Sequence, residues 1–373
     1  MDLFNVYSLF NVTPKSAKGC TITDDKGQEY LDMYAGNAVM NIGHSHPKYI
    51  KAVTDQLQQL TYSSNSFNNP LQDKLAQRLG KTTGYDNYSL FMCTSGAEAV
   101  ENALKLASFH TGRQRVLAFK RGYHGRTSGA AAVTDNPSIS SLFNRVHKVI
   151  FADINDTATL TKELETQKVA AVIIEPIQGT GGVHTPSLDF MQAMETLCRQ
   201  NGTMIIMDEI QTGFGRTGKF FAHQWMGLHP DLICIGKPMA NGLPCAGVMI
   251  APQFEAVKGR LGTTLGGSPL LTAAALSVLD VLEEDKLMDN AKQMGEFLKE
   301  HIPASPRIKE VRGKGLMLGI EFREPVAPIR QKLLYDKHII TGSAGMNVIR
   351  LLPPLCITQQ ECYTFINAIK SII

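Results

Sequence analysis

Two apolar runs in the second half of the chain have the length of buried strands, and each leads into a charged residue. Residues 203–207 lead into Asp208, and residues 232–235 lead through a glycine into Lys237. Short continuous apolar runs bounded by turn residues are typical of buried strands. Ligands of open α/β sheets bind at the carboxyl ends of the strands. Asp208 and Lys237 are therefore candidates for one shared site.

Apolar runs and helical periods alternate over roughly residues 50–270. Further strands are predicted at residues 89–93, 115–120, 148–151, 169–174 and 247–251. Helices are predicted from Pro47 onward, from Pro70 to Gly80, and at residues 96–110, 156–167 and 190–201. Regular alternation of strands and helices is the pattern of a mostly parallel sheet covered by helices, so an α/β domain is expected.

The two ends of the chain follow a different pattern. Residues 20–33 alternate on both sides of a polar Asp-Asp-Lys-Gly stretch, which predicts a β-hairpin. After Thr272 the predicted elements are helices at 273–284, 288–301 and 359–372 and strands at 308–312, 316–322 and 348–352. We expect a smaller α+β unit that the hairpin joins. The predicted organisation is an N-terminal segment (1–45), a large domain (46–272) and a small domain (273–373).

Composition argues against several classes of protein. The net charge of +3 is small and the basic residues are dispersed, so neither nucleic acid nor a membrane surface is an expected partner. No apolar run approaches the roughly 18 residues of a membrane span. The cysteines number seven and none lies in a C-x-x-C pair, so no disulfide framework and no metal site are indicated. The N-terminus does not read as a signal peptide, and a reducing, cytoplasmic compartment fits.

An aspartate and a lysine at neighbouring strand ends are the pair that pyridoxal phosphate (PLP) requires. The lysine binds the aldehyde covalently and shuttles protons, and the aspartate pairs with the pyridine nitrogen. Each residue alone could equally be a solvated charge at a strand end. The GFGRTG stretch at residues 213–218 matches a dinucleotide motif, but it does not follow its strand directly as such a loop must. We interpret it as a loop that lets the backbone pass close to another segment.

Three other places carry candidate chemistry. Ser95 and Glu98 form an S-x-x-E capping box around Gly96, and a glycine-lined helix start is a ready anion site. A plain capped helix is the alternative interpretation. The loop at residues 123–127 carries an aromatic ring, an imidazole and a guanidinium. Glu175 ends the predicted strand before it turns at a proline.

Longer motifs match a known family. In chain order they are GCTITDDKGQEYLDMYAGNAV, GHSHP, TSGAEAVENALKLA, YHGRT, EPIQG, DEIQTGFGRTG, KPMANGLP, GTTLGGSP and VIRLLPPL. Through them the chain resembles, over nearly its whole length, the subgroup III aminotransferases of the ornithine and acetylornithine type. The resemblance implies the α/β architecture of PLP-dependent transferase fold type I. In that fold a large, mostly parallel α/β domain carries a smaller α+β domain.

The resemblance also implies roles for individual residues. It makes Lys237 and Asp208 catalytic and puts Gln211 near the ring hydroxyl of PLP. The other cofactor-binding residues that it implies are Ser95, Gly96 and Ala97 at the phosphate, Tyr123 on the ring, and Thr264 from the partner subunit. The substrate-binding residues that it implies are Arg126 and Arg350 as carboxylate clamps, with Thr263, Asn37 and Glu175. The family therefore implies a homodimer with shared active sites.

Two positions depart from the family pattern. Asn37 stands where acyl-ornithine enzymes carry an aliphatic residue and free-ornithine enzymes carry a tyrosine. We expect it to face the acyl group from the partner subunit. Thr180 replaces a glutamate that pairs with the equivalent of Arg350 in related enzymes. Without that glutamate, we expect Arg350 to stay hydrated or to find another carboxylate.

The resemblance implies a PLP-dependent N-acylornithine aminotransferase of arginine biosynthesis, because YHGRT is typical of the acyl-ornithine branch and residue 37 is not tyrosine. Such an enzyme transfers the terminal amino group of N-acetyl- or N-succinylornithine to 2-oxoglutarate. The sequence leaves the acyl group open. Ornithine or another ω-amino acid is the alternative donor, and a catalytically idle PLP-binding protein is the remote alternative.

Overall fold

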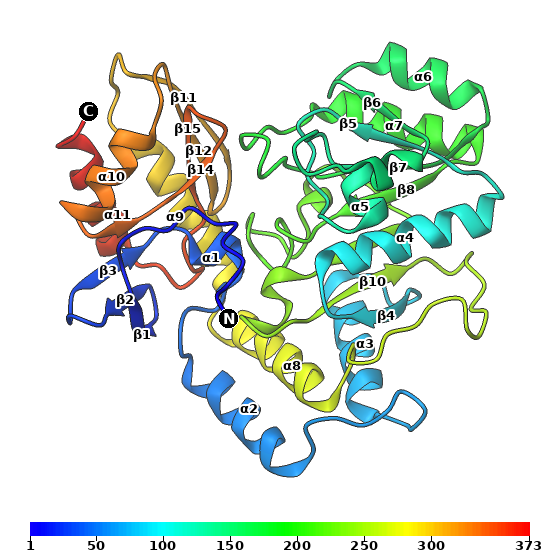
Figure 1. Ribbon diagram of the computed structural model, residues 1–373, viewed down its shortest axis with the longest axis horizontal. Coiled ribbons are helices and arrows are strands. Elements are labelled where there is room, and N and C mark those ends of the chain that lie inside the picture. Colours follow the sequence, from blue (N-terminus) through cyan, green and yellow to red (C-terminus); the bar gives the residue numbers. More distant parts are fainter.

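A seven-stranded sheet is the centre of the larger part of the molecule, and the computed structural model describes all 373 residues of the chain (Figure 1). In spatial order its strands are β4 (Ser89–Cys93), β10 (Ala246–Ile250), β9 (Leu232–Ile235), β8 (Met204–Asp208), β7 (Val169–Ile174), β5 (Arg115–Phe119) and β6 (Val149–Ala152). Strand β10 runs antiparallel to both of its neighbours, β4 and β9, and all the other pairings in the sheet are parallel. The predicted mostly parallel α/β sheet is confirmed.

Helices cover both faces of this sheet (Figure 1). On one face, α4 (Gly96–Thr111) packs a side rich in small alanines against the strands. On the other face, α6 (Thr157–Glu165) and α7 (Leu188–Asn201) pack in a separate apolar cluster. Because α4 directly follows β4, its first turn lies at the carboxyl end of that strand. The helix start is thereby brought to the edge where a ligand would bind.

The two ends of the chain build the second part, which contains two four-stranded sheets. One sheet consists of β1 (Pro14–Lys18), β2 (Thr21–Asp24), β3 (Glu29–Asp32) and β13 (Ile339–Ile340). The other consists of β11 (Ile308–Lys314), β12 (Met317–Phe322), β15 (Val348–Leu351) and β14 (Gly342–Ala344). Its helices are α9 (Leu287–His301), α10 (Ala327–Tyr335) and α11 (Gln359–Lys370). The predicted hairpin forms, and Leu31 of β3 pairs in parallel with Ile339 of β13.

Helix α8 (Pro269–Glu284) lies between the two parts and packs against α2 (Pro47–Gln59) and α3 (Pro70–Thr83). It begins earlier than the sequence predicted, because proline suits the first turn of a helix, where its missing N–H is not needed. From α8 the chain continues into α9. The predicted three-part division of the chain stays a prediction.

Helix α3 continues past Gly80, where the sequence predicted its end. A Cβ at Gly80 would lie 3.1 Å from the Cα of Asp86, so this glycine permits close packing and does not end the helix. The helix instead ends at Thr83, and Gly84 follows it with a left-handed φ of 79°. A left-handed glycine after the last turn is a common helix end.

The remaining helices are short. They are α1 (Ala35–Ala38), α5 (Ser128–Ala132), and the 3-10 turns η1 (Leu142–Val146), η2 (Ala222–Trp225) and η3 (Lys237–Ala240). Within α1, Gly36 and Asn37 have left-handed φ angles of 57° and 69°, so this segment is an irregular turn. None of the helices combines the length and the apolar character that crossing a membrane would require.

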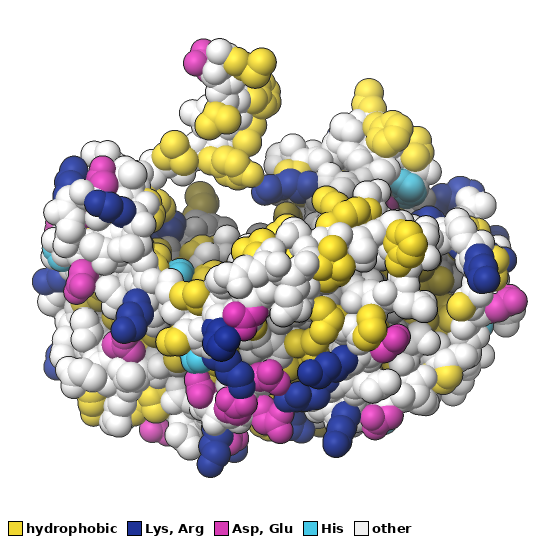
Figure 2. Space-filling view, turned by 90° about the horizontal axis from the view of Figure 1, so that it is seen from below, with side chains coloured by type: hydrophobic (Ala, Val, Ile, Leu, Met, Phe, Trp, Pro, Cys, Tyr) yellow, Lys and Arg dark blue, Asp and Glu magenta, His cyan; other side chains and the backbone are white.

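The first residues of the chain form an arm that projects from the surface, at the top of Figure 2. Its large apolar side chains are exposed: Met1, Leu3, Phe4, Val6, Tyr7, Leu9 and Phe10. Contiguous exposed apolar side chains are a feature of surfaces that contact another molecule.

The GFGRTG loop joins the two parts through a buried arginine. Arg216 is wholly buried, and its Nη1 donates to the carbonyl oxygens of Leu316 at 2.9 Å and Pro353 at 2.6 Å. Its Nη2 donates to Oδ1 of Asn41 at 2.5 Å. A Cβ at Gly215 would lie 2.8 Å from a side-chain carbon of α9. The glycines therefore allow the close approach that the sequence indicated.

Candidate active site

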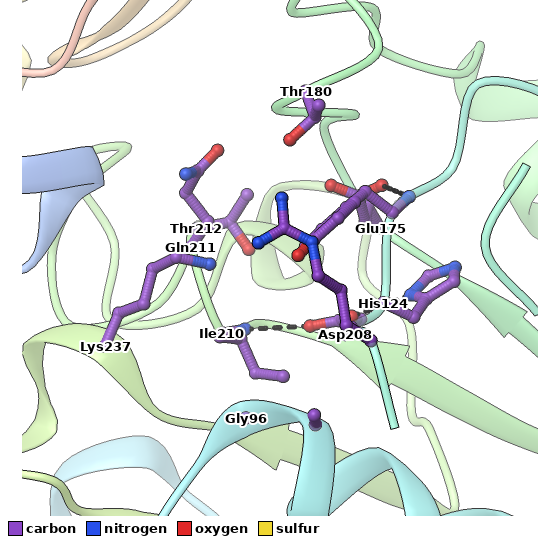
Figure 3. A pocket seen from close by; sticks show the side chains of 13 residues that line it. Gly96, His124, Glu175, Thr180, Asp208, Ile210, Gln211, Thr212 and Lys237 are labelled. Carbon is purple, nitrogen blue, oxygen red and sulfur yellow. Dashed lines mark hydrogen bonds and ion pairs between the residues drawn. The ribbon is translucent and has the colours of Figure 1, made fainter. Parts of the chain in front are cut away.

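A cavity of about 330 Å³ opens at the carboxyl ends of the central strands (Figure 3). Its lining consists of Gly96, Ala97, Tyr123, His124, Gly125, Arg126, Glu175, Thr180, Asp208, Ile210, Gln211, Thr212 and Lys237. Strand β7 leads to Glu175, β8 ends in Asp208, and β9 leads to Lys237. Most of the predicted site residues therefore meet in one cavity, although their individual roles stay predictions.

Lys237 is the first residue of η3 and has a φ of +37°. Non-glycine residues rarely adopt such angles, which cost roughly 1–3 kcal/mol and persist where the surroundings fix the residue. Burial lowers the pKa of Lys237 from its ordinary value, and the charge of Arg350 lowers it further, against the opposite influence of Asp208 and Glu175. An amine with a lowered pKa is more readily neutral and can act as nucleophile and base.

Asp208 is held from two sides (Figure 3). Its Oδ2 accepts a hydrogen bond from His124 Nδ1 at 2.7 Å, and its Oδ1 accepts one from the backbone N–H of Ile210 at 3.1 Å. Burial by itself lowers the pKa of His124, but the hydrogen bond and the charge of Asp208 outweigh it, so the pKa is raised. The hydrogen bond from His124 fixes the orientation of the Asp208 carboxylate.

The sequence did not assign His124 a role. From the sequence, His124 was noted only as one member of the YHGRT loop. Its partner Asp208 lies 84 residues further along the chain, so no local pattern links the two. An imidazole directly after the predicted ring-stacking tyrosine was the one available signal. The structure adds His124 to the site as the residue that positions Asp208.

The start of α4 faces the cavity with Gly96 and Ala97. Ser95 accepts a hydrogen bond from the N–H of Glu98 at 3.2 Å and caps the helix outside the cavity lining. The predicted capping box is only half formed, because Glu98 accepts from Thr94 N–H at 2.8 Å and from its hydroxyl at 2.9 Å. The first N–H groups of a helix have no intrahelical acceptor, so this glycine-lined start can bind an anion.

Glu175 lines the cavity (Figure 3) and ties two loops together. Its Oε1 accepts from Tyr123 N–H at 2.9 Å, and its Oε2 accepts from Gly179 N–H at 3.0 Å. Burial raises the pKa of Glu175. These contacts give Glu175 a structural task in shaping the loops, and its predicted contact with substrate stays a prediction.

Tyr123 and Arg126 lie in the same loop and face the cavity. The guanidinium carbon of Arg126 is 5.9 Å from the centre of the Tyr123 ring, a weak cation–π contact. Gly125 has a φ of 137°, and a Cβ there would lie 2.7 Å from the Cβ of Ala97. The loop can therefore sit directly against the start of α4, which brings the aromatic ring and the anion site together.

Arg350 lies beside the cavity on β15 and is only 5% exposed. The sequence predicted that Arg350 stays hydrated or finds another carboxylate. Within its own chain its hydrogen-bond partners are all neutral, so no carboxylate of this chain takes the place of the missing glutamate. Its Nε donates to the carbonyl oxygen of Ser343 at 2.9 Å, and its Nη2 donates to the hydroxyl of Tyr34 at 2.7 Å. Longer contacts of 3.5 Å join Nη1 to Gln211 Oε1 and Nη2 to Asn37 Oδ1.

Asn37 was expected to face the acyl group of the substrate from the partner subunit, and that role stays a prediction. Within its own chain its side chain contacts Tyr34 and Arg350. Its carbonyl oxygen accepts from Gln211 Nε2 at 3.3 Å, which places Asn37 next to the cavity of the same subunit. Tyr34 was missed by sequence reasoning, since it lies at the start of an irregular turn without a periodic pattern.

Thr263 and Thr264 are not brought to Lys237 within one chain. Thr263 lines a separate surface cavity of about 340 Å³ together with Asn65 and Gln72. Thr264 is exposed on the same loop. Their predicted contacts therefore depend on a second subunit.

Comparison with known proteins identifies the family. A family model described as aminotransferase class-III matches residues 5–373. The chain belongs to the class-III aminotransferases. The resemblance found in the motifs is thereby confirmed, and the fold that it implied agrees with the two-part architecture of the structure.

Relatives of this class-III aminotransferase match over nearly its entire length. The acetylornithine aminotransferase of Bacillus subtilis (strain 168) is 40% identical over 378 residues, which cover 100% of this chain and 97% of that protein. The solved ornithine aminotransferase of Toxoplasma gondii ME49 has a TM-score of 0.92 at 29% identity, covering 99% and 93% of the two chains. The solved acetylornithine aminotransferase of Elizabethkingia anophelis has a TM-score of 0.85 at 28% identity, and the match covers 99% of this chain and 95% of that one.

PLP is the cofactor of class-III aminotransferases and hence of this enzyme, as the sequence predicted. The cavity fits this group. Lys237 offers an amine of lowered pKa, Asp208 offers a fixed carboxylate, and the start of α4 offers N–H groups for a phosphate. A Cβ at Gly96 would lie 2.9 Å from the side chain of Ile210, so a larger residue would crowd this part of the cavity.

Proposed function

We propose that this class-III aminotransferase transfers the terminal amino group of N-acetyl- or N-succinylornithine to 2-oxoglutarate, as a step of arginine biosynthesis. The observation that carries the reaction is the meeting of Lys237 and Asp208 in one cavity at the strand ends, with the pKa of Lys237 lowered. The 40% identity over the whole chain with an acetylornithine aminotransferase supports the acylated donor.

Lys237 acts as the base of the reaction. When bound, PLP supplies an electron sink for the carbon that carries the amino group. Nζ of Lys237 takes the proton from that carbon and would return it to the cofactor carbon that receives the amino group. Because burial lowers its pKa, more of this amine is neutral near pH 7, which is what a general base requires.

The other cavity residues orient the cofactor. The carboxylate of Asp208, fixed by His124, faces the cavity and would pair with the pyridine nitrogen, and Gln211 in the same lining would serve the ring hydroxyl. The N–H groups of Gly96 and Ala97 would hold the phosphate at the positive end of α4. These groups need no rearrangement when charge develops, which is how preorganised sites stabilise a transition state.

Two arginines serve the substrate carboxylates. Arg126 lines the cavity and Arg350 lies beside it, joined to the lining through Gln211. A guanidinium binds a carboxylate with two parallel hydrogen bonds, so two arginines suit the two ends of 2-oxoglutarate. With the acylated donor, Arg126 binds the single α-carboxylate.

Free ornithine is the second candidate donor, and one contact favours it. The hydroxyl of Tyr34 hydrogen-bonds the side chain of Asn37, so a phenol lies beside the position where free-ornithine enzymes carry a tyrosine. That hydroxyl could hold the free α-amino group. The TM-score of 0.92 with an ornithine aminotransferase is consistent with this alternative.

The proposed enzyme is a homodimer with shared active sites. Thr263 and the exposed Thr264 lie away from the cavity of their own chain and could reach that of a partner. The projecting apolar arm at residues 1–10 offers further surface for a second subunit. Free thiols at all seven cysteines favour the proposed cytoplasmic location.

Steady-state kinetics with N-acetylornithine, N-succinylornithine and free ornithine, each with 2-oxoglutarate, tests the donor. We expect a higher kcat/KM for one of the acylated donors than for free ornithine. A preference for free ornithine would replace the proposal with the second candidate. A yellow protein that bleaches with none of these amines would contradict both.

A further inference from the structure

The guanidinium of Arg350 is buried but only partly satisfied. Two of its hydrogen bonds are short, to the carbonyl oxygen of Ser343 at 2.9 Å and to the hydroxyl of Tyr34 at 2.7 Å. Its contacts with Asn37 and Gln211 are 3.5 Å long. A buried cation is costly unless it meets an anion or strong acceptors. The weakly bonded N–H groups are therefore those that a ligand carboxylate can take most easily.

These weak contacts lie on the side of the cavity. Gln211 is part of the cavity lining and is labelled in Figure 3, and its amide nitrogen donates to the carbonyl oxygen of Asn37. Asn37 itself is exposed. A carboxylate arriving through the cavity can thus replace both long contacts while the short bonds to Ser343 and Tyr34 remain.

Tyr34 is held in place independently of any ligand. Its ring packs against the backbone of Gly342 so closely that a Cβ there would lie 1.9 Å from a ring carbon. The same ring lies 5.5 Å from the guanidinium carbon of Arg350. Because the ring is fixed, the hydroxyl stays beside the guanidinium whether or not Asn37 moves.

The Tyr34 hydroxyl can donate a hydrogen bond as well as accept one. It accepts from Arg350 Nη2, so its own proton is free to be donated, and it donates that proton to Oδ1 of Asn37. A carboxylate that displaces Asn37 presents an oxygen acceptor in the same place. The hydroxyl proton can rotate to that oxygen without breaking the bond from Arg350.

We propose that Tyr34 determines carboxylate affinity at Arg350, by holding the guanidinium in place and by donating its hydroxyl proton to the carboxylate of the acceptor. This inference rests on the proposed function, in which Arg350 binds 2-oxoglutarate. It makes Tyr34 and Arg350 a composite carboxylate site. Tyr34 makes the shortest hydrogen bond to the guanidinium, at 2.7 Å, and it remains part of the site after the ligand binds.

The test is Tyr34→Phe in the PLP-loaded enzyme, which keeps the ring and removes the hydroxyl. The probe is glutarate, a five-carbon dicarboxylate that cannot react because it has no oxo group. A hydrogen bond to a charged group corresponds to a change of about 10- to 100-fold in binding. We therefore expect the Kd for glutarate, measured by calorimetry, and the KM for 2-oxoglutarate to rise by that factor. The rate of the half-reaction with N-acetylornithine, whose α-amino group is acylated and cannot use this hydroxyl as a free amine would, should stay near that of the wild type.

A matched control is Tyr88→Phe. The Tyr88 hydroxyl donates a hydrogen bond to the carbonyl oxygen of Pro230 at 2.7 Å, away from the cavity. This control should leave glutarate binding unchanged. In an Arg350→Lys background, where the planar fork is absent, Tyr34→Phe should have a much smaller effect on glutarate binding than in the wild type.

Glutarate binding needs neither a donor nor turnover, so it can be measured even if the proposed donor is wrong. An unchanged or lower Kd for glutarate in Tyr34→Phe would overturn the inference, because Tyr34 would then be a passive neighbour or a competitor for Arg350. Equal losses in the donor and acceptor half-reactions would also overturn it, since they would indicate general damage to the site.

Discussion

The two carboxylates on the floor of the cavity are well hydrogen-bonded, whereas the arginine on its rim is bonded only in part. On the floor, which we define as Lys237, Asp208, His124 and Glu175, both carboxylates are buried and accept short hydrogen bonds of 2.7–3.1 Å from an imidazole or from backbone N–H groups. On the rim, defined as Tyr34, Asn37, Thr180 and Arg350, the arginine has only neutral partners, and two of them lie 3.5 Å away.

We infer from this difference that the floor carries the reaction itself and that the rim selects the substrate. Breaking a buried pair such as Asp208 and His124 costs several kcal/mol, so the floor has one stable arrangement. Long contacts to neutral amides are weak, so the rim can exchange them for ligand atoms. We therefore expect substitutions on the floor to reduce turnover with every substrate, and substitutions on the rim to discriminate between substrates.

Lys237→Ala should have the largest effect of these substitutions, and we expect turnover to fall by several orders of magnitude. The reason is that the covalent and the general-base role reside in one side chain. Cofactor absorbance should also reveal weaker binding of PLP. Lys219→Ala, at a half-buried lysine that lies over Trp225 outside the cavity lining, serves as the control. A Lys237→Ala enzyme with a tenth of the wild-type rate would refute the assignment.

Asp208→Asn tests whether the floor depends on charge as well as on shape. The variant should retain PLP, because the amide has the same shape. Removing one preorganised electrostatic group typically costs roughly 100- to 1000-fold in rate, and we expect a loss of that size here. Single-turnover absorbance changes with the amino donor provide the measurement. An unchanged single-turnover rate would show that Asp208 does not pair with the cofactor.

Thr180→Glu changes the rim, and its effect should be confined to the acceptor. The new carboxylate would pair with Arg350 and compete with the carboxylate of 2-oxoglutarate. Breaking a partly exposed ion pair costs about 1–2 kcal/mol, so KM for 2-oxoglutarate should rise roughly 5- to 30-fold. Stopped-flow measurement of the two half-reactions should find the donor step nearly unchanged.

Thr180→Gln is the matched control for that experiment, since it adds a similar volume without charge. It should leave KM for 2-oxoglutarate close to the wild-type value. If Thr180→Glu also leaves it unmoved, residue 180 does not reach Arg350 and has no part in selecting the acceptor.

Asn37→Ile should have the smallest and most selective effect. An amide can donate to and accept from an acyl group, and such a polar contact is worth about 0.5–1.5 kcal/mol, or more with a charged partner. We therefore expect kcat/KM to fall further for N-succinylornithine than for N-acetylornithine, by about 2- to 10-fold. The two substrates act as each other's control, and equal losses would remove this role of Asn37.

The floor could largely be predicted from the sequence, because its residues end apolar runs that mark buried strands. Asp208 and Lys237 were found in this way, and β7 pointed to Glu175. His124 could not be found so, since its partner lies far along the chain and no period links the two. The helix α10 and the strands β13 and β14 were also missed, the strands because two or three residues carry no period.

The rim was predicted in part only. The resemblance supplied Arg350 and Asn37, but not the partner that Arg350 has in this chain. Tyr34 lies in an irregular turn in which Gly36 and Asn37 adopt left-handed angles, so neither helical nor strand spacing indicates where its ring points. Contacts between such turns depend on tertiary packing, which local patterns do not encode.

The buried Arg216 has a consequence for how this enzyme denatures. Its guanidinium is bonded to oxygens of Leu316, Pro353 and Asn41, which belong to segments far from it in sequence. If the sheet of β11, β12, β15 and β14 melted first, a cation and several acceptors would lose their partners inside an apolar interior, at about 1–3 kcal/mol for each group. Melting of either part therefore destabilises the other. Heating should disorder the entire chain cooperatively, and a weakening substitution in that sheet should lower the temperature at which the PLP site is lost.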